Sequence, residues 1–371
     1  MVRDRPYGRA ERVMMHRPSG QKKQSRAARS RAARFIALLA LLVLFLSSGC
    51  RRTIRSECSF FAMDTYMTLT AYGAGEDVLQ GAEEKIREIE ERLSVTKDSS
   101  ELSRLNREES AEVSEDTMRL LSSTIKYAET TEGALDPSIY PVTKLWGFTT
   151  GEYRVPSDEE ISEALKRVGW FRIGLESREE GRGFVSLPEG FMIDLGAVAK
   201  GYAGEELKAY FHERGVESAL LDLGGNIQTV GMKPDGSPFR IAVKDPQGSS
   251  YLGVLSLDLP DLAVVTSGAY ERYFEESGKR YGHIMDPMTG RPAESGLLSV
   301  TIVHVDGVLC DAFSTACFVM GEERSIDFWR SFNSFEFIMV TEDGRLLVSE
   351  GEAERFVKDG NCPYKLEIIR R

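Results

Sequence analysis

Long apolar runs, histidine and cysteine are scarce in this sequence of 371 residues. The longest apolar run, Phe35 to Leu46, has twelve residues, which is too short for a mature membrane-spanning helix but typical of a signal-peptide core. Neither an internal repeat nor a long low-complexity linker divides the roughly 320 residues that follow. That length is enough for one large domain or for two lobes that share a core.

The N-terminal segment has the order of a bacterial lipoprotein signal. Residues 1–34 hold eleven Lys or Arg against two acids, and the apolar run then ends in Leu46-Ser47-Ser48-Gly49-Cys50. Small residues followed directly by Cys resemble the lipobox, in which the Cys becomes the lipidated first residue. We therefore expect a signal peptide at 1–49, lipidation at Cys50, a tether at 50–59, and attachment to the outer or periplasmic face of a membrane. An ordinary secretory signal and an uncleaved anchor are the alternatives.

The charge of the mature chain is strongly negative. Loss of residues 1–49 changes the formal net charge from −11 to about −20. Such a body will not bind nucleic acid through charge, and an anionic ligand would need a cation or a local basic residue.

Cysteine is scarce: four cysteines follow Cys50, and an even number in an exported protein permits disulfides. On a helix, Cys310 and Cys317 lie two turns apart, or about 10 Å between Cα atoms, which is beyond the reach of a disulfide. We expect both to be small buried residues.

Periodicity predicts an α+β fold without strict β-α-β alternation. Helices are expected at Val78–Leu93, at Thr117–Thr130, and at Ile161–Val168 after a Ser157/Glu160 capping box, with Gly169 closing the last one. A strand is expected from Phe60 to Tyr72, interrupted at Met63-Asp64-Thr65. Further short strands are expected near Val185, Met192–Leu195, Leu220–Leu223, Ile241–Lys244, Leu255–Leu257 and Leu262–Thr266.

The octet Cys310 to Cys317 is the central candidate for chemistry. As the first turns of a helix it places Asp311, Ser314 and Thr315 at i, i+3 and i+4, so one carboxylate and two hydroxyls share a face. Hard oxygen donors of this kind suit Mg²⁺. The alternative is a helix start capped by Asp311, and the octet taken alone favours that cap.

A second candidate is His283, one of only four histidines. It ends a strand and precedes the tight turn Asp286-Pro287-Met288-Thr289-Gly290, whose formation does not require a His. Proton transfer or phosphate contact is one interpretation, and a structural His is the other.

Three glycine-containing stretches could position a ligand. Asp194 to Ala203 is typical of strand, Gly turn and helix, where the helix N-terminus favours an anion and Lys200 supplies local positive charge. Asp222 to Asn226 is a turn between strands and is best explained as a plain hairpin. Gly133 to Pro137 ends a helix and carries Asp136, which could accept a hydrogen bond from a ribityl or ribose hydroxyl; a helix C-cap is the alternative.

Taken together and in this order, these stretches resemble one family. The patterns are M-x-T, G-A-x-D-P, D-[LV]-G-x-x-A-K-G-Y-A, D-x-G-G-N, H-I-x-D-P-x-T-G-x-P and D-A-x-S-T-A, behind a lipobox. The set is similar to the ApbE family, the FAD:protein FMN transferases, from about Phe60 to the C-terminus. The resemblance implies a two-lobed α+β fold with FAD in a cleft between the lobes.

The resemblance also implies roles for individual residues. Mg²⁺ on the pyrophosphate would be held by Asp311, Thr315, Ser314 and the backbone carbonyl of Ala197. Flavin and adenylate contacts would fall on Met63, Ala134, Leu135, Asp136, Asp194, Lys200 and Met285. His283 matches the family's His and would take the proton or stabilise the phosphate.

The implied reaction is transfer of FMN from FAD to a Thr hydroxyl of an acceptor protein, such as a membrane redox subunit or a secreted flavoprotein, with release of AMP. The segment Ser94 to Lys97 departs from the family because it lacks the aromatic residue often found there. A wetter site would favour hydrolysis of FAD to FMN and AMP, which is the alternative reaction. A third hypothesis is a lipoprotein that binds flavin without chemistry, and Mn²⁺ could replace Mg²⁺ at an oxygen site.

Overall fold

The computed structural model describes residues 54–178, 182–248 and 250–371, which belong to one compact unit, Ile54–Arg371. The expected signal peptide at 1–49 and the lipidation site Cys50 lie outside these described residues. Within them, no helix is both long enough and apolar enough to cross a membrane.

A nine-stranded sheet forms the centre of the unit, in the order β1-β2-β6-β7-β10-β15-β16-β17-β19. Neighbouring strands pair antiparallel except for β17 and β19, which are parallel. The strands are β1 (Arg55–Ala62), β2 (Thr65–Tyr72), β6 (Ser218–Asp222), β7 (Asn226–Gly231), β10 (Ala263–Ser267), β15 (Leu297–His304), β16 (Glu336–Thr341), β17 (Arg345–Ser349) and β19 (Lys365–Ile369).

Both faces of the sheet's middle are covered, and the alternation of side chains shows how. In β16, Phe337 and Met339 belong to one apolar cluster, whereas Ile338 and Val340 belong to another. Because successive side chains of a strand point to opposite faces, the two clusters lie on opposite sides of the sheet.

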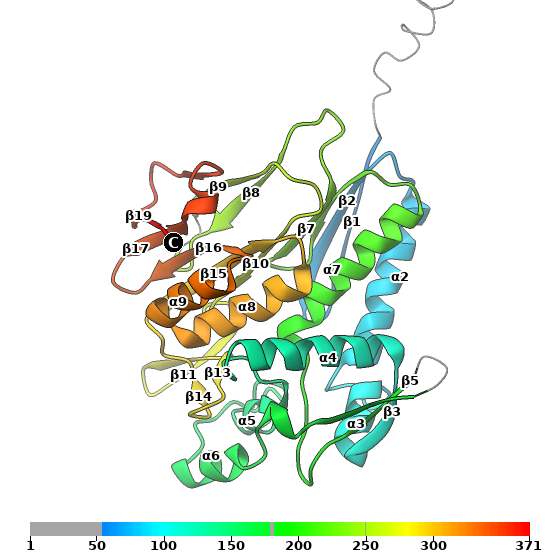
Figure 1. Cartoon of the computed structure of the whole chain (residues 1–371), viewed down its shortest axis with the longest axis vertical. Helices are drawn as coiled ribbons and strands as arrows, with labels where there is room; N and C mark the ends of the chain where they lie inside the picture. Colours follow the sequence, from blue (N-terminus) through cyan, green and yellow to red (C-terminus); the bar gives the residue numbers. More distant parts are fainter. Residues whose placement is uncertain (1–53, 179–181, 249) are drawn as a thin grey trace, which may run out of the picture. The chain divides into compact units, whose positions relative to one another are not determined.

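Helices cover the first face (Figure 1). They are α2 (Glu76–Leu93), α7 (Gly196–Glu213), α8 (Gly307–Met320) and α9 (Glu322–Phe332). A three-stranded sheet covers the second face; its strands are β8 (Phe239–Lys244), β9 (Tyr251–Leu257) and β18 (Phe356–Lys358). A short 3₁₀ turn, η3 (Glu350–Glu352), precedes β18.

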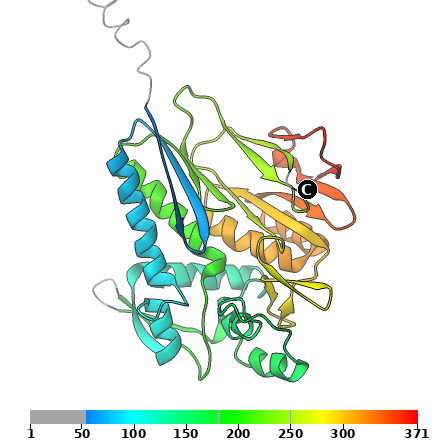
Figure 2. The same ribbon diagram turned by 180° about the vertical axis from the view of Figure 1, so that it is seen from behind.

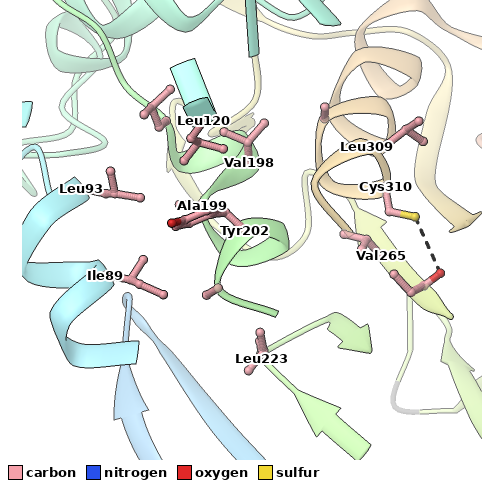
Figure 3. Close-up of a cluster of buried hydrophobic side chains, with 14 of the residues drawn as sticks. Ile89, Leu93, Leu120, Val198, Ala199, Tyr202, Leu223, Val265, Leu309 and Cys310 are labelled. Atoms are coloured by element: carbon pink, nitrogen blue, oxygen red, sulfur yellow. Dashed lines mark hydrogen bonds between the residues drawn. The ribbon is translucent and has the colours of Figure 1, made fainter. Parts of the chain in front are cut away.

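The packing of α7 between α2 and α8 fixes the position of the candidate site. Figure 3 shows Ile89 and Leu93 of α2 on one side of α7 and Leu309 and Cys310 of α8 on the other. The Cys310 thiol contacts the Ala263 carbonyl oxygen at 3.7 Å. Cys58, Cys310, Cys317 and Cys362 are all free thiols, so the expectation that Cys310 and Cys317 do not pair is confirmed.

The described residues of 94–178 and 182–195 form a smaller lobe beyond the ends of α2 and α7 (Figure 2). Its elements are α3 (Glu101–Glu108), β3 (Ser110–Ser114), α4 (Glu115–Thr130), η1 (Pro137–Ile139), α5 (Tyr140–Leu145), α6 (Asp158–Leu165), η2 (Trp170–Arg172), β4 (Gly174–Ser177) and β5 (Arg182–Ser186). Two small hairpins, β11 (Tyr273–Glu276) with β12 (Lys279–Gly282) and β13 (Met285–Asp286) with β14 (Arg291–Pro292), complete the unit. The predicted α+β, two-lobed fold is confirmed.

Most of the predicted elements are present, with four differences, the last of which is the β1–β2 hairpin. The helix expected at Ile161–Val168 has its Ser157/Glu160 capping box but ends at Leu165, and Gly169 instead precedes η2 with φ 148°. Met192–Leu195 forms no strand. The residues 55–59 expected in the tether belong to β1, so the folded unit starts earlier than predicted.

The single strand expected from Phe60 to Tyr72 is a hairpin. Met63 and Asp64 form its two-residue turn, with φ of 49° and 59°. Positive φ at both central residues is the geometry of a type I′ turn, whose twist matches that of the flanking strands.

Candidate functional site

A cavity of about 560 Å³ lies where the smaller lobe meets the helical face of the sheet. Its walls come from segments that are far apart in the sequence: 63–65, 93–97, 134–137, 194–200, 266–268 and 283–285, together with Asp311 and Thr315. A volume in the range of about 300 to 1,000 Å³ is typical of sites for small molecules and cofactors.

Helix α8 brings Asp311 and Thr315 to this cavity. The helix begins at Gly307, and its N-cap is Asp306, whose side chain accepts from the amides of Val308 at 2.9 Å and Leu309 at 3.1 Å. The cap interpretation of Asp311 is therefore wrong, because Asp306 already performs that role. Asp311 and Thr315 are instead one turn apart inside the helix, and both line the cavity.

The Asp311 carboxylate is only 4% exposed and is held by the neighbouring helix α7. Its Oδ2 accepts a hydrogen bond of 2.7 Å from the Gly201 amide. Burial raises the pKa of Asp311, and the positive charge of Lys200 opposes that effect. A carboxylate has about four acceptor positions, so this bond leaves capacity for a cation.

The same hydrogen bond affects the carbonyl of Ala197. In a regular helix the Gly201 amide donates to the carbonyl four residues earlier, which is that of Ala197. Here the Gly201 amide also serves Asp311, and Ala197 lies on the cavity wall in the first turn of α7. The Ala197 carbonyl oxygen therefore shares its helical donor, the Gly201 amide, with the Asp311 carboxylate. With Asp311 and Thr315 nearby, it is a suitable third oxygen for Mg²⁺.

Ser314 occupies a different position from its two neighbours. It is fully buried, donates to the Asp311 carbonyl oxygen at 3.0 Å, and lies 2.8 Å from the Ser267 hydroxyl. Ser314 is not among the residues that line the cavity, whereas Ser267 is. Ser314 therefore contacts the cavity through Ser267, whose hydroxyl also lies 3.3 Å from that of Thr315.

His283 lies on the cavity wall in a defined orientation. Its Nδ1 is 3.1 Å from the Arg272 carbonyl oxygen, an acceptor, so Nδ1 carries the proton and Nε2 has a free lone pair. Burial, together with the charges of Arg272 and Lys200, lowers the pKa of His283 to about 4. The ring is therefore neutral at neutral pH and able to accept a proton.

Asp136 is held more tightly than the sequence indicated. Its Oδ1 accepts from the Ser138 amide and hydroxyl, and its Oδ2 accepts from the Trp170 amide at 3.1 Å. Burial raises its pKa. Oδ1 thus caps η1 and Oδ2 is bonded to the first residue of η2, while Ala134, Leu135 and Asp136 all line the cavity.

The remaining predicted contact residues also reach the cavity. Met63 lies in the β1–β2 turn, and Met285 is buried in β13. Asp194 accepts from the Gly196 amide at 2.8 Å at the start of α7, and burial raises its pKa. Lys200, one turn further along α7, is partly exposed to the cavity and supplies the expected local positive charge.

Several charged residues that line the cavity were not predicted from the sequence, and two of them lie between β10 and His283. Glu271 and Arg272 line the cavity after β10, and Arg272 approaches the Asp64 carboxylate at 3.5 Å. Desolvation raises the pKa of Glu271, and the charges of Lys200 and Lys244 oppose it. The sequence feature that could have indicated Glu271 and Arg272 is their position between a predicted strand and His283.

The segment without the aromatic residue lies on the same wall. Thr96 lines the cavity, and the Ser94 hydroxyl accepts from the amides of Thr96 and Lys97, each at 3.2 Å. This side of the cavity is therefore polar.

The arrangement suits a phosphate-bearing ligand together with one divalent cation. Over the part of the chain that the structure describes, no three His, Cys, Asp or Glu side chains converge as a metal cluster. The oxygen set of Asp311, Thr315 and Ala197 contains one charge only, so a cation there would share its ligands with a bound anion, as Mg²⁺ does on phosphates.

Comparison with known proteins adds independent information. Residues 63–339 match the family model described as "ApbE family". An FAD:protein FMN transferase of Vibrio cholerae serotype O1 is 32% identical over 321 residues, covering 83% of this chain and 94% of the relative. An FAD:protein FMN transferase of Treponema pallidum is 33% identical, covering 71% and 76%. The crystal structure of the ApbE protein of Thermotoga maritima superposes with a TM-score of 0.76 at 34% identity, covering 82% of this chain and all of that one.

Proposed function

The chain belongs to the ApbE family, and on this premise we propose that it is a transferase that moves the FMN part of FAD onto a threonine hydroxyl of an acceptor protein and releases AMP, with Mg²⁺ bound. The observation that carries the proposal is the juxtaposition, in one cavity, of the buried Asp311 carboxylate and the neutral His283 ring. Storage of flavin would not require a cation site and a base together.

The reaction is a substitution at phosphorus. The acceptor oxygen forms a bond to the ribityl-side phosphorus of FAD, the bond from that phosphorus to the bridging oxygen breaks, and AMP leaves with that oxygen. Catalysis of this kind depends mainly on positioning, on charge neutralisation and on removal of the hydroxyl proton. Bound Mg²⁺ supplies charge neutralisation on the pyrophosphate.

The protein's own residues would supply the rest. Asp311, Thr315 and the Ala197 carbonyl would hold the cation, and Lys200 would contribute a second positive charge to an otherwise acidic molecule. His283 would accept the hydroxyl proton at Nε2, because its Nδ1 donates to the Arg272 carbonyl and its low pKa keeps Nε2 unprotonated. The walls formed by Met63, Ala134, Leu135 and Met285 would receive the flavin and adenylate.

Hydrolysis of FAD to FMN and AMP is the second candidate, and Thr96 is the observation that favours it. Water and a threonine hydroxyl are similar nucleophiles, so the outcome depends on positioning of the acceptor and on exclusion of water. A polar Thr96 on the cavity wall excludes water less well than an aromatic side chain would.

Mass spectrometry tests the proposal directly. Purified protein, FAD and Mg²⁺ are incubated with exported candidate acceptors, and the digest is searched for a threonine that carries FMN. We expect such a peptide with the wild-type protein and none when Mg²⁺ is replaced by a chelator. Release of FMN and AMP at an unchanged rate in the presence of acceptors, with no labelled threonine, would establish the hydrolase instead.

We also propose that the protein acts at a membrane surface, attached through Cys50. The proposal depends on the order of basic lead, apolar core and Leu46-Ser47-Ser48-Gly49-Cys50. Several acyl chains hold a protein firmly at a bilayer, whereas a single chain binds only marginally.

A further inference from the structure

An aromatic pair is exposed on the β1–β2 hairpin, close to the turn that lines the cavity. Phe61 and Tyr66 face each other across the two strands and are 62% and 65% exposed. Farther along the hairpin, the Ser59 hydroxyl lies 3.0 Å from that of Thr68, and the buried Thr70 hydroxyl donates to the Glu57 carboxylate at 3.0 Å. Two large apolar rings left in water side by side indicate an interaction site.

The pair is adjacent to the proposed reaction. The two-residue turn that links Phe61's strand to Tyr66's strand is Met63-Asp64, and both turn residues line the cavity. Asp64 approaches Arg272 of the opposite wall at 3.5 Å, so the turn forms part of the cavity rim. A macromolecule that offers a hydroxyl to the cavity can contact this tip.

Among the described residues, no strand pairs with the outer edge of β1. β1 is the terminal strand of the nine-stranded sheet. In a hairpin with a two-residue turn, the residues that flank the turn form a hydrogen-bonded pair, here Ala62 and Thr65, and the next pair does not. The N–H and C=O groups of Phe61 and Ser59 therefore point outward, away from β2.

The part of this edge that is near the cavity lacks the usual protection. Charged side chains normally discourage pairing at an edge strand. On β1 the charged residues, Arg55 and Glu57, occupy the far end, and the segment from Cys58 to Ala62 carries none. On β19, at the opposite edge of the sheet, Lys365 and Glu367 place charges along the strand.

We propose that the acceptor protein docks here, as an extended segment that adds to the edge of β1 and packs an apolar side chain against Phe61 and Tyr66. This inference rests on the proposed function, because transfer to a protein requires a place where that protein is held. Backbone pairing would give affinity for an extended segment, and the aromatic pair would select an apolar residue next to the modified threonine.

The experiment uses the full-length protein, FAD, Mg²⁺ and a synthetic peptide that covers the acceptor segment found to carry FMN. The double variant Phe61→Ser/Tyr66→Ser should raise the KM for the peptide by about tenfold or more, as loss of an aromatic anchor does. FAD binding, followed by flavin fluorescence, and AMP release without peptide should stay within about twofold of wild type, a free-energy difference of less than about 0.5 kcal/mol. Tyr251→Ser is the matched control, because Tyr251 is 54% exposed on β9, whose sheet contributes no residue to the cavity.

A second pair of variants separates the backbone edge from the side chains. Ser59→Pro removes an outward amide without removing a backbone hydrogen bond between β1 and β2, although it also removes the hydroxyl that is bonded to Thr68. Ser59→Ala removes the same hydroxyl and keeps the amide, so the two variants differ at the backbone edge. We expect Ser59→Pro to raise the peptide KM and Ser59→Ala to leave it unchanged.

The outcomes separate this proposal from the proposed function. If the wild-type protein labels the acceptor and the double variant has an unchanged KM for the peptide, the docking proposal is contradicted and the proposed transferase activity stands. Parallel loss of FAD binding in the double variant assigns the pair to the FAD site and contradicts docking. If the wild-type protein labels no acceptor, both the proposed transferase activity and the docking proposal are contradicted.

Discussion

At the scale of single residues, the account depends on Asp311 as the charged ligand of the cation. Asp311→Asn keeps an oxygen that can accept from the Gly201 amide but removes the charge. Because a Lewis-acid cation contributes several kcal/mol, we expect Mg²⁺-dependent turnover to fall by about a hundredfold or more. Thr315→Val should cost less, since a neutral hydroxyl contributes less to a cation than a carboxylate.

The measurement is AMP release against Mg²⁺ concentration, with the free energy of unfolding from urea denaturation as the check on folding. Ser314→Ala serves as the comparison on the same helix, because Ser314 does not line the cavity. Full activity of Asp311→Asn at low Mg²⁺ would show that Asp311 is only a structural acceptor for Gly201.

The pH dependence of His283 follows from its low pKa. A base must be unprotonated, so activity is lost as pH falls through the pKa of the free enzyme's base. With the pKa of His283 lowered to about 4, kcat/KM for FAD should show no loss around pH 6.5, the ordinary value for histidine, and should decline only well below it. His283→Asn should reduce turnover by about a hundredfold or more.

The profile is measured from pH 4 upward with Mg²⁺ saturating. An acidic limb centred at the ordinary histidine pKa, absent from His283→Asn, would contradict the neutral, desolvated ring. If the His283→Asn variant retains the wild-type kcat, a group other than His283 accepts the hydroxyl proton.

At the scale of elements, the site requires close contact of α7 and α8. A Cβ added at Gly201 would lie 2.2 Å from the Gly307 carbonyl oxygen and 2.9 Å from the Asp311 Cβ. Because neither backbone can move independently in a packed pair of helices, Gly201→Ala should destabilise the protein by about 1–3 kcal/mol, despite the higher helix propensity of alanine. It should also weaken the response to Mg²⁺.

Urea denaturation measures the first effect, with Gly360→Ala as control, since an added Cβ there meets nothing within 4 Å. A Gly201→Ala protein as stable as the control would contradict the tight approach of the two helices.

The loop after α2 lines the cavity and is proposed to affect how much water enters it. A tyrosine at position 96 would cover part of the wall that Thr96 now forms. Thr96→Tyr should therefore lower AMP release without acceptor several-fold relative to FMN transfer, because water is excluded while the acceptor route is kept. Thr96→Val, which removes the hydroxyl without adding a ring, should leave the ratio of AMP release to FMN transfer unchanged. Equal ratios in the wild-type, Thr96→Tyr and Thr96→Val proteins would show that this loop does not affect the choice between water and the acceptor.

The elements also show how far the sequence predicts the structure. The amphipathic helices α2 and α4 and the capping box of α6 follow from local patterns, and so does the shared face of Asp311 and Thr315. The hairpin at Met63-Asp64 was predicted as one strand because its turn lacks the Asn-Gly or Gly residues that usually mark a type I′ turn. Met192–Leu195 fails to pair because the Asp194 amide bonds instead to the Pro137 carbonyl at 2.8 Å.

Other features of the site depend on tertiary contacts that no local pattern contains. Ser314 shares a helical face with Asp311 by spacing, yet its hydroxyl is drawn to Ser267, a residue of another element. Glu271 and Arg272 reach the cavity only because the chain after β10 turns back toward His283. Asp136 looked free in the sequence and is occupied by Ser138 and Trp170 in the fold.

At the scale of the whole molecule, the proposed lipidation at Cys50 concerns where the enzyme acts. We expect wild-type protein in the membrane fraction and Cys50→Ser in the soluble fraction of fractionated cells, because a lipid on Cys50 would supply the anchor. Cys58→Ser, at a free cysteine within β1, is the matched control and should remain membrane-bound. A Cys50→Ser protein that stays in membranes uncleaved would identify residues 35–46 as an uncleaved anchor.

The site itself is assembled only by the complete fold. Asp311 bonds to Gly201, 110 residues away in the sequence, and Asp64 approaches Arg272, 208 residues away. An acidic chain thereby gathers Lys200, Arg272 and the oxygens of the proposed cation site around one cavity, which is the charge arrangement that a pyrophosphate-bearing substrate requires.

The ratio of AMP released to FMN bound covalently to the acceptor, measured in one reaction with FAD and Mg²⁺, tests the central claim most directly. The account predicts that at saturating acceptor this ratio is close to one, that both products disappear with Asp311→Asn, and that AMP release without acceptor is slow. AMP and free FMN formed at the same rate with and without acceptor, and no FMN on any threonine, would contradict it.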